Sequence, residues 1–389
     1  MNEWKTYRIG DICKRVCSGG TPKSTEPSYY DGEIPWLNTK EINFNRISST
    51  EKHITQSGLD NSSAKWIDKN SVIVAMYGAT AAKVAINTIP LTTNQACCNL
   101  SIDETKADYR FVYYWLCSHY TELASLANGG AQQNINAQQI KDFEIKLPEI
   151  QIQQKIADLL WSIDNKIICN KSINDNLEQQ AQAAFNNIIA QYSECETINL
   201  SEIAVLNPKR AIAKGTLARS IEMAQLPTSG SFPAGWDMKE YNGGMKFQNG
   251  DTLMARITPC LENGKVAYIN FLEENEVAFG STEYIVIASK GAIAPEVFYF
   301  LTRHNDFVDF AVKNMNGSSG RQRVSAETIG TYKLPIISPE DMFILETIAK
   351  EALKKIKYNS LENIRLSEIR DTLLPKLMSG ELKINNLDC

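Results

Sequence analysis

Two long stretches of the chain repeat apolar residues at steps of three and four positions, the period of an amphipathic α-helix. The first, residues 152–188, contains no Gly or Pro, and the second, residues 348–373, follows Ser338 and Pro339, a typical helix start. So narrow and long a stripe is typical of a coiled-coil seam. Its positions are Ile152, Ile156, Leu159, Ile163, Ile167, Asn170, Ile173, Leu177, Ala181, Ala184 and Ile188 in the first stretch, and Ile348, Ala352, Ile356, Asn359, Asn363, Leu366, Ile369 and Leu373 in the second. We therefore predict two helices, each on the order of 60 Å long, that pack antiparallel on each other. We expect Pro375 and Gly380 to end the second.

Asparagine interrupts both stripes. Asn170 lies in the first stripe, and Asn359 or Asn363 lies in the second. A buried asparagine in a coiled coil can fix the register at some cost in stability, whereas a solvent-facing one has no such role. The sequence leaves both interpretations open.

The segments that precede the two helices resemble each other in the order of their elements, about 190 residues apart. Lys-Val-Ala follows an apolar strand at 83–85 and again at 265–267, and VYYWL at 112–116 matches VFYFL at 297–301. Short β-rich runs with one or two helices predict an α+β fold with a pseudo-two-fold internal repeat. Its parts are expected to be two similar domains, residues 1–148 and 193–337, and two long helices, residues 149–192 and 338–389, the last with a C-terminal tail.

The composition is that of a globular protein, with 43% hydrophobic and 22% charged residues. A net charge of −5 gives no overall sign of a nucleic-acid partner, so DNA affinity would require local patches or basic partner chains. No run is apolar enough to span a membrane, and no export leader is apparent. The nine scattered cysteines predict free thiols in a reducing cytoplasm, with a zinc site through Cys13 and Cys17 as the alternative.

A loop near the start of the chain, residues 18–42, reads SGGTPKSTEPSYYDGEIPWLNTKEI. Three Gly and three Pro favour turns over helix, and its aromatic residues argue against disorder. We interpret it as a structured binding loop. Trp36 is expected to pack, whereas Tyr29 and Tyr30 fit packing and contact equally well.

Two similar domains held at a fixed spacing suit a ligand with two similar sites, and duplex DNA is such a ligand. Asn and Gln pair bidentately with adenine, and Lys and Arg suit guanine or phosphate. In the first domain the candidate DNA-binding residues, in predicted loops, are Ser18, Gly19, Gly20, Thr21, Lys23, Asn38, Thr39, Lys40, Tyr77, Lys83, Gln132, Gln133 and Asn134.

The second domain offers candidates in comparable places, including the most basic short patch of the chain at residues 318–323. They are Lys209, Arg210, Arg256, Lys265, Arg321, Gln322 and Arg323. For the residues of both domains the alternative is an ordinary polar surface side chain or turn.

Several motifs together resemble one family. SGGTPKS…YYDGEIPWLNTKEI, SVIVAMYG at 71–78, the helix entry LP…IQQKIADLL and the closing LLPKLMSGEL at 373–382 look like the specificity subunit of type I restriction–modification systems. The resemblance covers the whole chain. The second domain departs from the Gly-Gly-Thr-Pro form and begins Asn207-Pro208-Lys209-Arg210, so it resembles a different recognition-domain subtype.

This resemblance implies a non-catalytic DNA-binding subunit that reads a bipartite, asymmetric target in double-stranded DNA. Two methyltransferase subunits and restriction (translocase–nuclease) subunits are the implied partners. It also implies that this chain binds no cofactor and no metal, with S-adenosylmethionine, ATP and Mg²⁺ on the partner subunits.

Two other classes of function compete with this interpretation. A single-chain DNA methyltransferase would need an Asn/Asp-Pro-Pro-aromatic motif, and the nearest match, Asn207-Pro208-Lys209, lacks the second Pro and the aromatic residue. No Gly-x-x-x-x-Gly-Lys-Ser/Thr phosphate loop is present either. A two-headed protein-binding scaffold is the third class, and the steep salt dependence of DNA binding would distinguish it.

Overall fold

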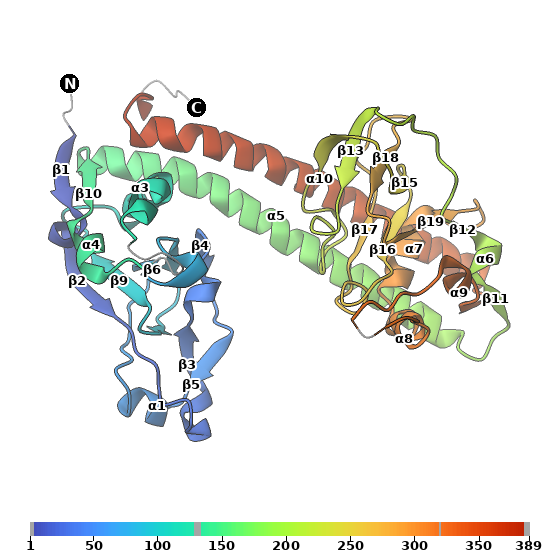
Figure 1. Cartoon of the computed structure of the whole chain (residues 1–389), viewed down its shortest axis with the longest axis horizontal. Helices are drawn as coiled ribbons and strands as arrows, with labels where there is room; N and C mark the ends of the chain where they lie inside the picture. Colours follow the sequence, from blue (N-terminus) through green and yellow to red (C-terminus); the bar gives the residue numbers. More distant parts are fainter. Residues whose placement is uncertain (1–3, 128–133, 319, 385–389) are drawn as a thin grey trace. The chain divides into compact units, whose positions relative to one another are not determined.

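The computed structural model describes residues 4–127, 134–318 and 320–384 (Figure 1). The chain forms two compact units. Unit 1 comprises Met1–Asn165 and Leu366–Cys389, and unit 2 comprises Lys166–Arg365. The boundary falls inside both long helices, so each unit combines a β-rich domain with a segment of each helix.

Unit 1 is built on a five-stranded sheet with the order β2-β9-β6-β7-β4, in which only β4 and β7 pair in parallel. A three-stranded sheet, β5-β3-β8, and the pair β1-β10 complete the strands. The strands are β1 (Lys5–Arg8), β2 (Cys13–Ser18), β3 (Tyr30–Leu37), β4 (Asn45–Ile47), β5 (Lys52–Ile54), β6 (Val72–Ala75), β7 (Val84–Asn87), β8 (Thr92–Thr93), β9 (Cys97–Ile102) and β10 (Glu144–Leu147). The short helices are η1 (Ile9–Ile12), η2 (Pro27–Tyr29), η3 (Thr39–Glu41), α1 (Gln56–Asp60), η4 (Gly78–Thr80), α2 (Tyr109–Ser118), α3 (Tyr120–Ser125) and α4 (Ala137–Asp142).

Apolar runs explain the core of unit 1. β6 and β7 are buried at every position, as expected for strands covered on both faces. Asp108 caps the N-terminus of helix α2, and its side chain accepts hydrogen bonds from the main-chain N–H groups of Arg110 and Phe111 in the first turn. The core joins Phe111 and Leu116 of α2 to Leu160 and Leu377 of the long helices.

Unit 2 has a four-stranded antiparallel sheet with the order β12-β19-β16-β17 and a second sheet with the order β14-β13-β18-β15. Its strands are β11 (Thr197–Asn199), β12 (Ala204–Leu206), β13 (Leu217–Ile221), β14 (Asp237–Glu240), β15 (Met245–Phe247), β16 (Thr252–Ala255), β17 (Val266–Tyr268), β18 (Ala278–Gly280), β19 (Tyr284–Ser289) and β20 (Lys333–Pro335). Its short helices are α6 (Leu200–Ile203), α7 (Pro295–Thr302), α8 (Asn305–Lys313) and α9 (Ala326–Gly330).

The internal duplication predicted from the sequence is confirmed in the main chain. Strands β2, β9, β6 and β7 have the order and directions of β12, β19, β16 and β17. Ala75 N donates to Lys83 O at 2.9 Å, and Ala255 N donates to Lys265 O at 3.0 Å. The two Lys-Val-Ala segments therefore occupy equivalent places.

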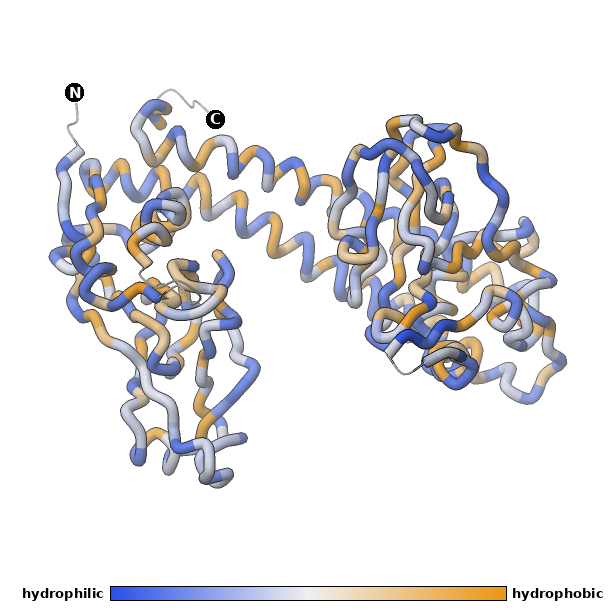
Figure 2. Tube along the Cα trace, viewed as in Figure 1, coloured by the Kyte–Doolittle hydropathy of each residue, from blue (hydrophilic) through white to orange (hydrophobic). Residues whose placement is uncertain are grey.

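The two long helices are α5 (Ile150–Gln191) and α10 (Pro339–Met378), and apolar and polar positions alternate along both (Figure 2). Within unit 1, Arg370 Nη1 donates to Asp164 Oδ1 at 3.0 Å, and Leu377 packs in one cluster with Leu160. Contact positions on α5 fall as those on α10 rise. The helix segments in unit 1 therefore pair antiparallel, as predicted.

In unit 2 the helix segments pair through a layer of buried asparagines. Asn170 Nδ2 donates to Glu362 Oε2 at 2.7 Å and to Asn363 Oδ1 at 2.9 Å, and Asn359 Nδ2 donates to Asn174 Oδ1 at 2.8 Å. Asn170 is 1% exposed and Asn359 is 3% exposed. The asparagines are therefore buried and paired, which favours the interpretation that they fix the register.

The structure corrects the predicted seam at several positions. Ile173 and Ile369 are 38% and 48% exposed, whereas Phe185, which the stripe omitted, is fully buried. Helix α10 also continues past Pro375 to Met378. Leu377 and Met378 are buried in the core of unit 1, and this burial stabilises the final turn. Within the described part of the chain, no helix is long and apolar enough to cross a membrane.

Candidate nucleic-acid interface

Strand order in unit 1 brings most of the candidate residues to one edge of the five-stranded sheet. At this edge β2 and β6 end, and β9, β7 and β4 begin. Ser18 ends β2, Tyr77 follows β6 and Lys83 precedes β7. We call this the unit 1 edge.

Main-chain hydrogen bonds tie the loops of the unit 1 edge together. Gly20 N donates to Thr93 O at 2.8 Å, and Asn94 N donates to Leu37 O at 3.0 Å. Met76 N donates to Ala96 O at 2.8 Å, and Ile135 N donates to Met76 O at 2.9 Å. The predicted loops at 18–23, 38–40, 77 and 134 therefore meet at one surface.

The side chains at the unit 1 edge are mainly amides and hydroxyls. Asn94 Nδ2 donates to Asn38 Oδ1 at 3.2 Å, and the Thr21 hydroxyl donates to Gln95 Oε1. Tyr77 is 44% exposed. Thr21, Lys23, Lys40, Gln95 and Asn134 are exposed as well, whereas Thr39 is half-buried beside Asn38. These groups can donate to and accept from base edges.

The two lysines nearest to strand ends are already paired within unit 1. Lys83 Nζ donates to Asn43 Oδ1 at 2.8 Å, and Lys40 forms an ion pair with Glu51. Gln95 was not among the predicted residues. The sequence feature that could have identified Gln95 is its place in the polar segment TTNQA, which comes directly before the buried strand β9.

Gly19 and Gly20 require a correction, because they do not offer their backbone to a ligand. Both are buried. A Cβ at Gly19 would lie 2.1 Å from Thr93 O, and one at Gly20 would lie 2.2 Å from Ala64 N. The two glycines are therefore needed for close packing inside the domain.

Aromatic side chains hold the opening loop in place. Trp36 Nε1 donates to Gly20 O at 2.9 Å, and the Tyr30 hydroxyl donates to Pro22 O at 2.6 Å. The two rings also meet edge to face, with centroids 6.2 Å apart. Trp36 packs as expected, and for Tyr30 the packing interpretation holds.

Unit 2 has an equivalent edge, where β16 ends and β19 and β17 begin. Arg256 N donates to Glu283 O at 3.0 Å, and Val324 N donates to Arg256 O at 3.0 Å. Thr258 N donates to Gln322 O at 3.0 Å. We call this the unit 2 edge. It brings Arg256, Lys265 and residues 321–323 together.

Charged side chains dominate the unit 2 edge. Arg323 donates through Nε and Nη2 to the carboxylate of Glu283 at 2.8–3.0 Å. This hydrogen-bonded guanidinium lowers the pKa of Glu283 from its ordinary value. Arg256 has a buried Nε with no hydrogen-bond partner among the described residues. Arg321 is exposed, and Lys265 Nζ donates to Met223 O at 2.6 Å.

Arg210 requires a second correction, since it lies away from the unit 2 edge. Its Nη2 donates to Asp251 Oδ1 at 2.6 Å, and Asp251 is 1% exposed. Asp251 precedes β16 whereas Arg256 follows it, a separation on the order of 15 Å. The chain leaves the sheet at Asn207, where φ is +54°, before it reaches the edge. Arg210 therefore neutralises a buried carboxylate, while Lys209 is exposed on the same loop.

Three further results concern the remaining candidates. Gln132 and Gln133 lie outside the described residues. Among the residues that are described, no group of three or more His, Cys, Asp or Glu side chains could hold a metal ion. Cys13 and Cys17 both lie in β2, and burial raises the pKa of the Cys13 thiol to about 12.

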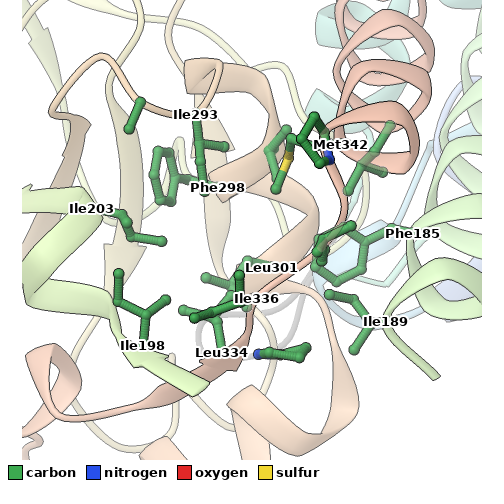
Figure 3. A pocket seen from close by; sticks show the side chains of 16 residues that line it. Phe185, Ile189, Ile198, Ile203, Ile293, Phe298, Leu301, Leu334, Ile336 and Met342 are labelled. Atoms are coloured by element: carbon green, nitrogen blue, oxygen red, sulfur yellow. The ribbon is translucent and has the colours of Figure 1, made fainter. Parts of the chain in front are cut away.

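A cavity of about 350 Å³ opens in unit 2 between α5, α7 and α10 (Figure 3). Phe185, Phe298, Leu301, Ile336 and Met342 point into it. Its lining contains no titratable side chain, so it supplies no acid, base or nucleophile. The sheet edges remain the places where polar groups converge.

Comparison with known proteins gives a consistent result. Residues 1–179 match the family model described as the type I restriction modification DNA specificity domain. The MjaIX type I restriction enzyme specificity subunit of Methanocaldococcus jannaschii is 24% identical over 99% of this chain and 95% of that protein. The HindI specificity subunit of Haemophilus influenzae is 21% identical over 98% of this chain and 100% of that protein.

The fold is also known from a solved structure. The S subunit of a type I restriction–modification system from M. genitalium aligns with a TM-score of 0.64 and 19% identity, covering 96% of each chain. At that identity the match shows a shared fold. The resemblance seen in the motifs is thus confirmed: over nearly its whole length the chain is similar to specificity subunits of type I restriction–modification systems, and residues 1–179 match the DNA specificity domain of that family.

Proposed function

We propose that this chain reads a bipartite, asymmetric DNA target, with the unit 1 edge on one half-site and the unit 2 edge on the other. One observation carries the proposal. The two edges share one main-chain scaffold but carry different side chains. Met76, Ala96 and Asn134 of unit 1 stand where unit 2 has Arg256, Glu283 and Arg323.

The different side chains suit different bases. Amides such as Asn38, Gln95 and Asn134 match the donor and acceptor pair of adenine in the major groove, whereas arginines match guanine or phosphate. A pseudo-symmetric scaffold with unlike contacts therefore favours a target whose halves differ. Because the chain's net charge is −5, we expect the phosphate attraction to come from local basic patches and from partner subunits.

The role that we propose is non-catalytic. Methyl transfer, DNA translocation and cleavage belong to two methyltransferase subunits and to restriction subunits, which would hold S-adenosylmethionine, ATP and Mg²⁺. The absence of a methyltransferase motif and of a phosphate loop from the sequence supports this division. We therefore expect the purified chain, without partners, to transfer no methyl group.

Exposed apolar side chains on the long helices support a partner-binding role. Ile168 on α5 is 44% exposed, and Phe343 and Tyr358 on α10 are 70% and 58% exposed. Large apolar and aromatic side chains of this kind are typical of protein interfaces. We assign the methyltransferase contact to these helices.

The test is a domain exchange in cells that express the chain with its partner subunits. Replacing residues 1–148 by the first domain of another family member should change one half of the methylated motif and leave the other half as it was. Methylome sequencing gives the result directly. A change in both halves would contradict independent reading by the two units.

A further inference from the structure

The guanidinium of Arg323 is held on two sides at the unit 2 edge. Nε donates to both carboxylate oxygens of Glu283, at 3.0 Å and 2.9 Å, and Nη2 donates to Oε1 at 2.8 Å. Nη1 donates to the main-chain oxygen of Arg321 at 3.2 Å. The Arg323 side chain nevertheless remains 39% exposed.

The hydrogen bonds to Glu283 and Arg321 leave two N–H groups of the Arg323 guanidinium without a partner among the described residues. A guanidinium has five N–H groups, one on Nε and two on each terminal nitrogen. The bonds to Glu283 and to Arg321 occupy three of them. One N–H therefore remains on Nη1 and one on Nη2. Two adjacent donors in a fixed plane match the O6 and N7 acceptors of guanine in the major groove.

The charge of this pair also favours a base over a phosphate. The Glu283 carboxylate neutralises Arg323, so the pair adds little to the attraction for the DNA backbone. Arg321, two residues earlier and exposed, forms no ion pair with another described residue. Fixing the arginine in advance also reduces the side-chain entropy that is lost on binding.

We propose that Arg323 reads a guanine in the half-site of unit 2, and that Glu283 is its positioning residue. This inference rests on the proposed function. In unit 1 the equivalent places hold Asn134 and Ala96, which cannot form such a pair. The guanine requirement from this device is therefore confined to one half of the target.

The first experiment needs no variant. The complete complex of this chain with its partner subunits is tested on duplexes that carry its methylated motif, with single guanines replaced by 7-deazaguanine, which lacks the N7 acceptor. We expect replacement of one guanine of the second half-site to weaken binding by roughly 2- to 12-fold, about half of the free energy of a bidentate base contact, because the probe removes N7 and keeps O6. If no guanine of that half-site responds, the inference is overturned.

Variants then assign the contact to Arg323. Arg323→Ala should abolish the effect of that 7-deazaguanine. The charge-balanced double variant Arg323→Ala/Glu283→Gln, which leaves no unpaired carboxylate at the edge, should keep the dependence of binding on salt unchanged. The matched control Arg321→Ala should keep base discrimination. It should lower the slope of log K against log salt concentration by about one unit, the loss of one phosphate contact. A salt slope that falls in the double variant Arg323→Ala/Glu283→Gln would instead show a phosphate contact and overturn the assignment.

A double-mutant cycle tests the role of Glu283. Glu283→Gln should weaken discrimination between guanine and 7-deazaguanine at the same position. In the Arg323→Ala background it should have no further effect on that discrimination. Discrimination in the first half-site shows in each case that the complex is folded and assembled. A complex that reads no bipartite motif would contradict the proposed function, whereas intact bipartite reading with an indifferent Arg323 would contradict this inference alone.

Discussion

Phe185 offers a direct test of how the long helix α5 is anchored in unit 2. Its side chain is fully buried in a cluster with Phe298, Leu301 and Leu345, and its ring meets the ring of His304 with centroids 5.8 Å apart. We expect Phe185→Ala to destabilise unit 2. Truncation removes apolar burial and leaves space that the surrounding side chains fill only in part.

The expected size follows from the burial. Phe→Ala changes at buried sites cost about 3–5 kcal/mol. For a unit of the size of residues 166–365, 1 kcal/mol shifts Tm by about 2–4 °C. The melting temperature of unit 2 should therefore fall by roughly 6–20 °C. Phe343, which is 70% exposed on α10, is the matched control, and Phe343→Ala should change stability by less than about 0.5 kcal/mol.

Hydrogen exchange read by mass spectrometry measures this effect segment by segment. Peptides from β16 and β19 should lose protection in Phe185→Ala, while peptides from β6 in unit 1 serve as the internal reference. Wild-type protection in β16 and β19 would refute the argument that Phe185 anchors the helix. Equal losses in the two phenylalanine variants would refute the burial argument itself.

Two further predictions concern buried polar groups in unit 2. Asn170→Ala leaves Asn363 Oδ1 without its donor and Glu362 with only its ion pair to Lys166, and it should cost about 1–3 kcal/mol in chemical unfolding. The exposed Asn187→Ala should stay within about 0.5 kcal/mol. Equal costs would contradict a buried polar layer. Burial raises the pKa of Glu178 above its ordinary value, although its carboxylate accepts a hydrogen bond from Tyr299. The folded state therefore binds the Glu178 proton more tightly than the unfolded state, so stability from this group should fall as the pH rises above about 4.5. Glu178→Gln should remove that part of the slope, and parallel pH profiles for the two proteins would show that Glu178 does not contribute.

The helices could be predicted because their signal is local. A period of three to four over more than thirty residues without Gly or Pro has few other solutions. The errors arise from the same pattern. A straight helix of 3.6 residues per turn drifts by about 20° per heptad from an ideal seam, so Ile173 and Ile369 turn outward. Phe185 was missed because the stripe counted aliphatic residues.

The candidate interface was predictable only where the repeat supplied a second copy. The two Lys-Val-Ala segments pointed to the same edge of both sheets. Gly19, Gly20 and Arg210 were misjudged because their partners, Thr93, Ala64 and Asp251, are distant in sequence. Local sequence does not show whether the space beside a glycine is open to a ligand or is filled by the protein's own backbone.

Glu283 and Gln95 were missed for a related reason. Each lies in a short polar run before a buried strand, Gln95 in TTNQ and Glu283 in STE, a place with no periodic pattern. The repeat did hold a usable signal, since Ala96 and Glu283, the residues directly before β9 and β19, fall at equivalent places on the two edges, and Gln95 is next to Ala96. Reading the repeat residue by residue would have drawn attention to these positions.

The main-chain bonds that join the loops at each edge have a consequence for how such a chain can change its target. Met76 and Arg256 make the same two backbone bonds, so these bonds do not depend on the side chain, although the side chain of Met76 is buried in the core of unit 1. The same holds for Ala96 and Glu283, and for Asn134 and Arg323. With the half-site reading that we propose, a few substitutions at solvent-accessible positions such as Asn134 or Arg323 would change the preferred bases of one half-site and leave the other half-site as it is.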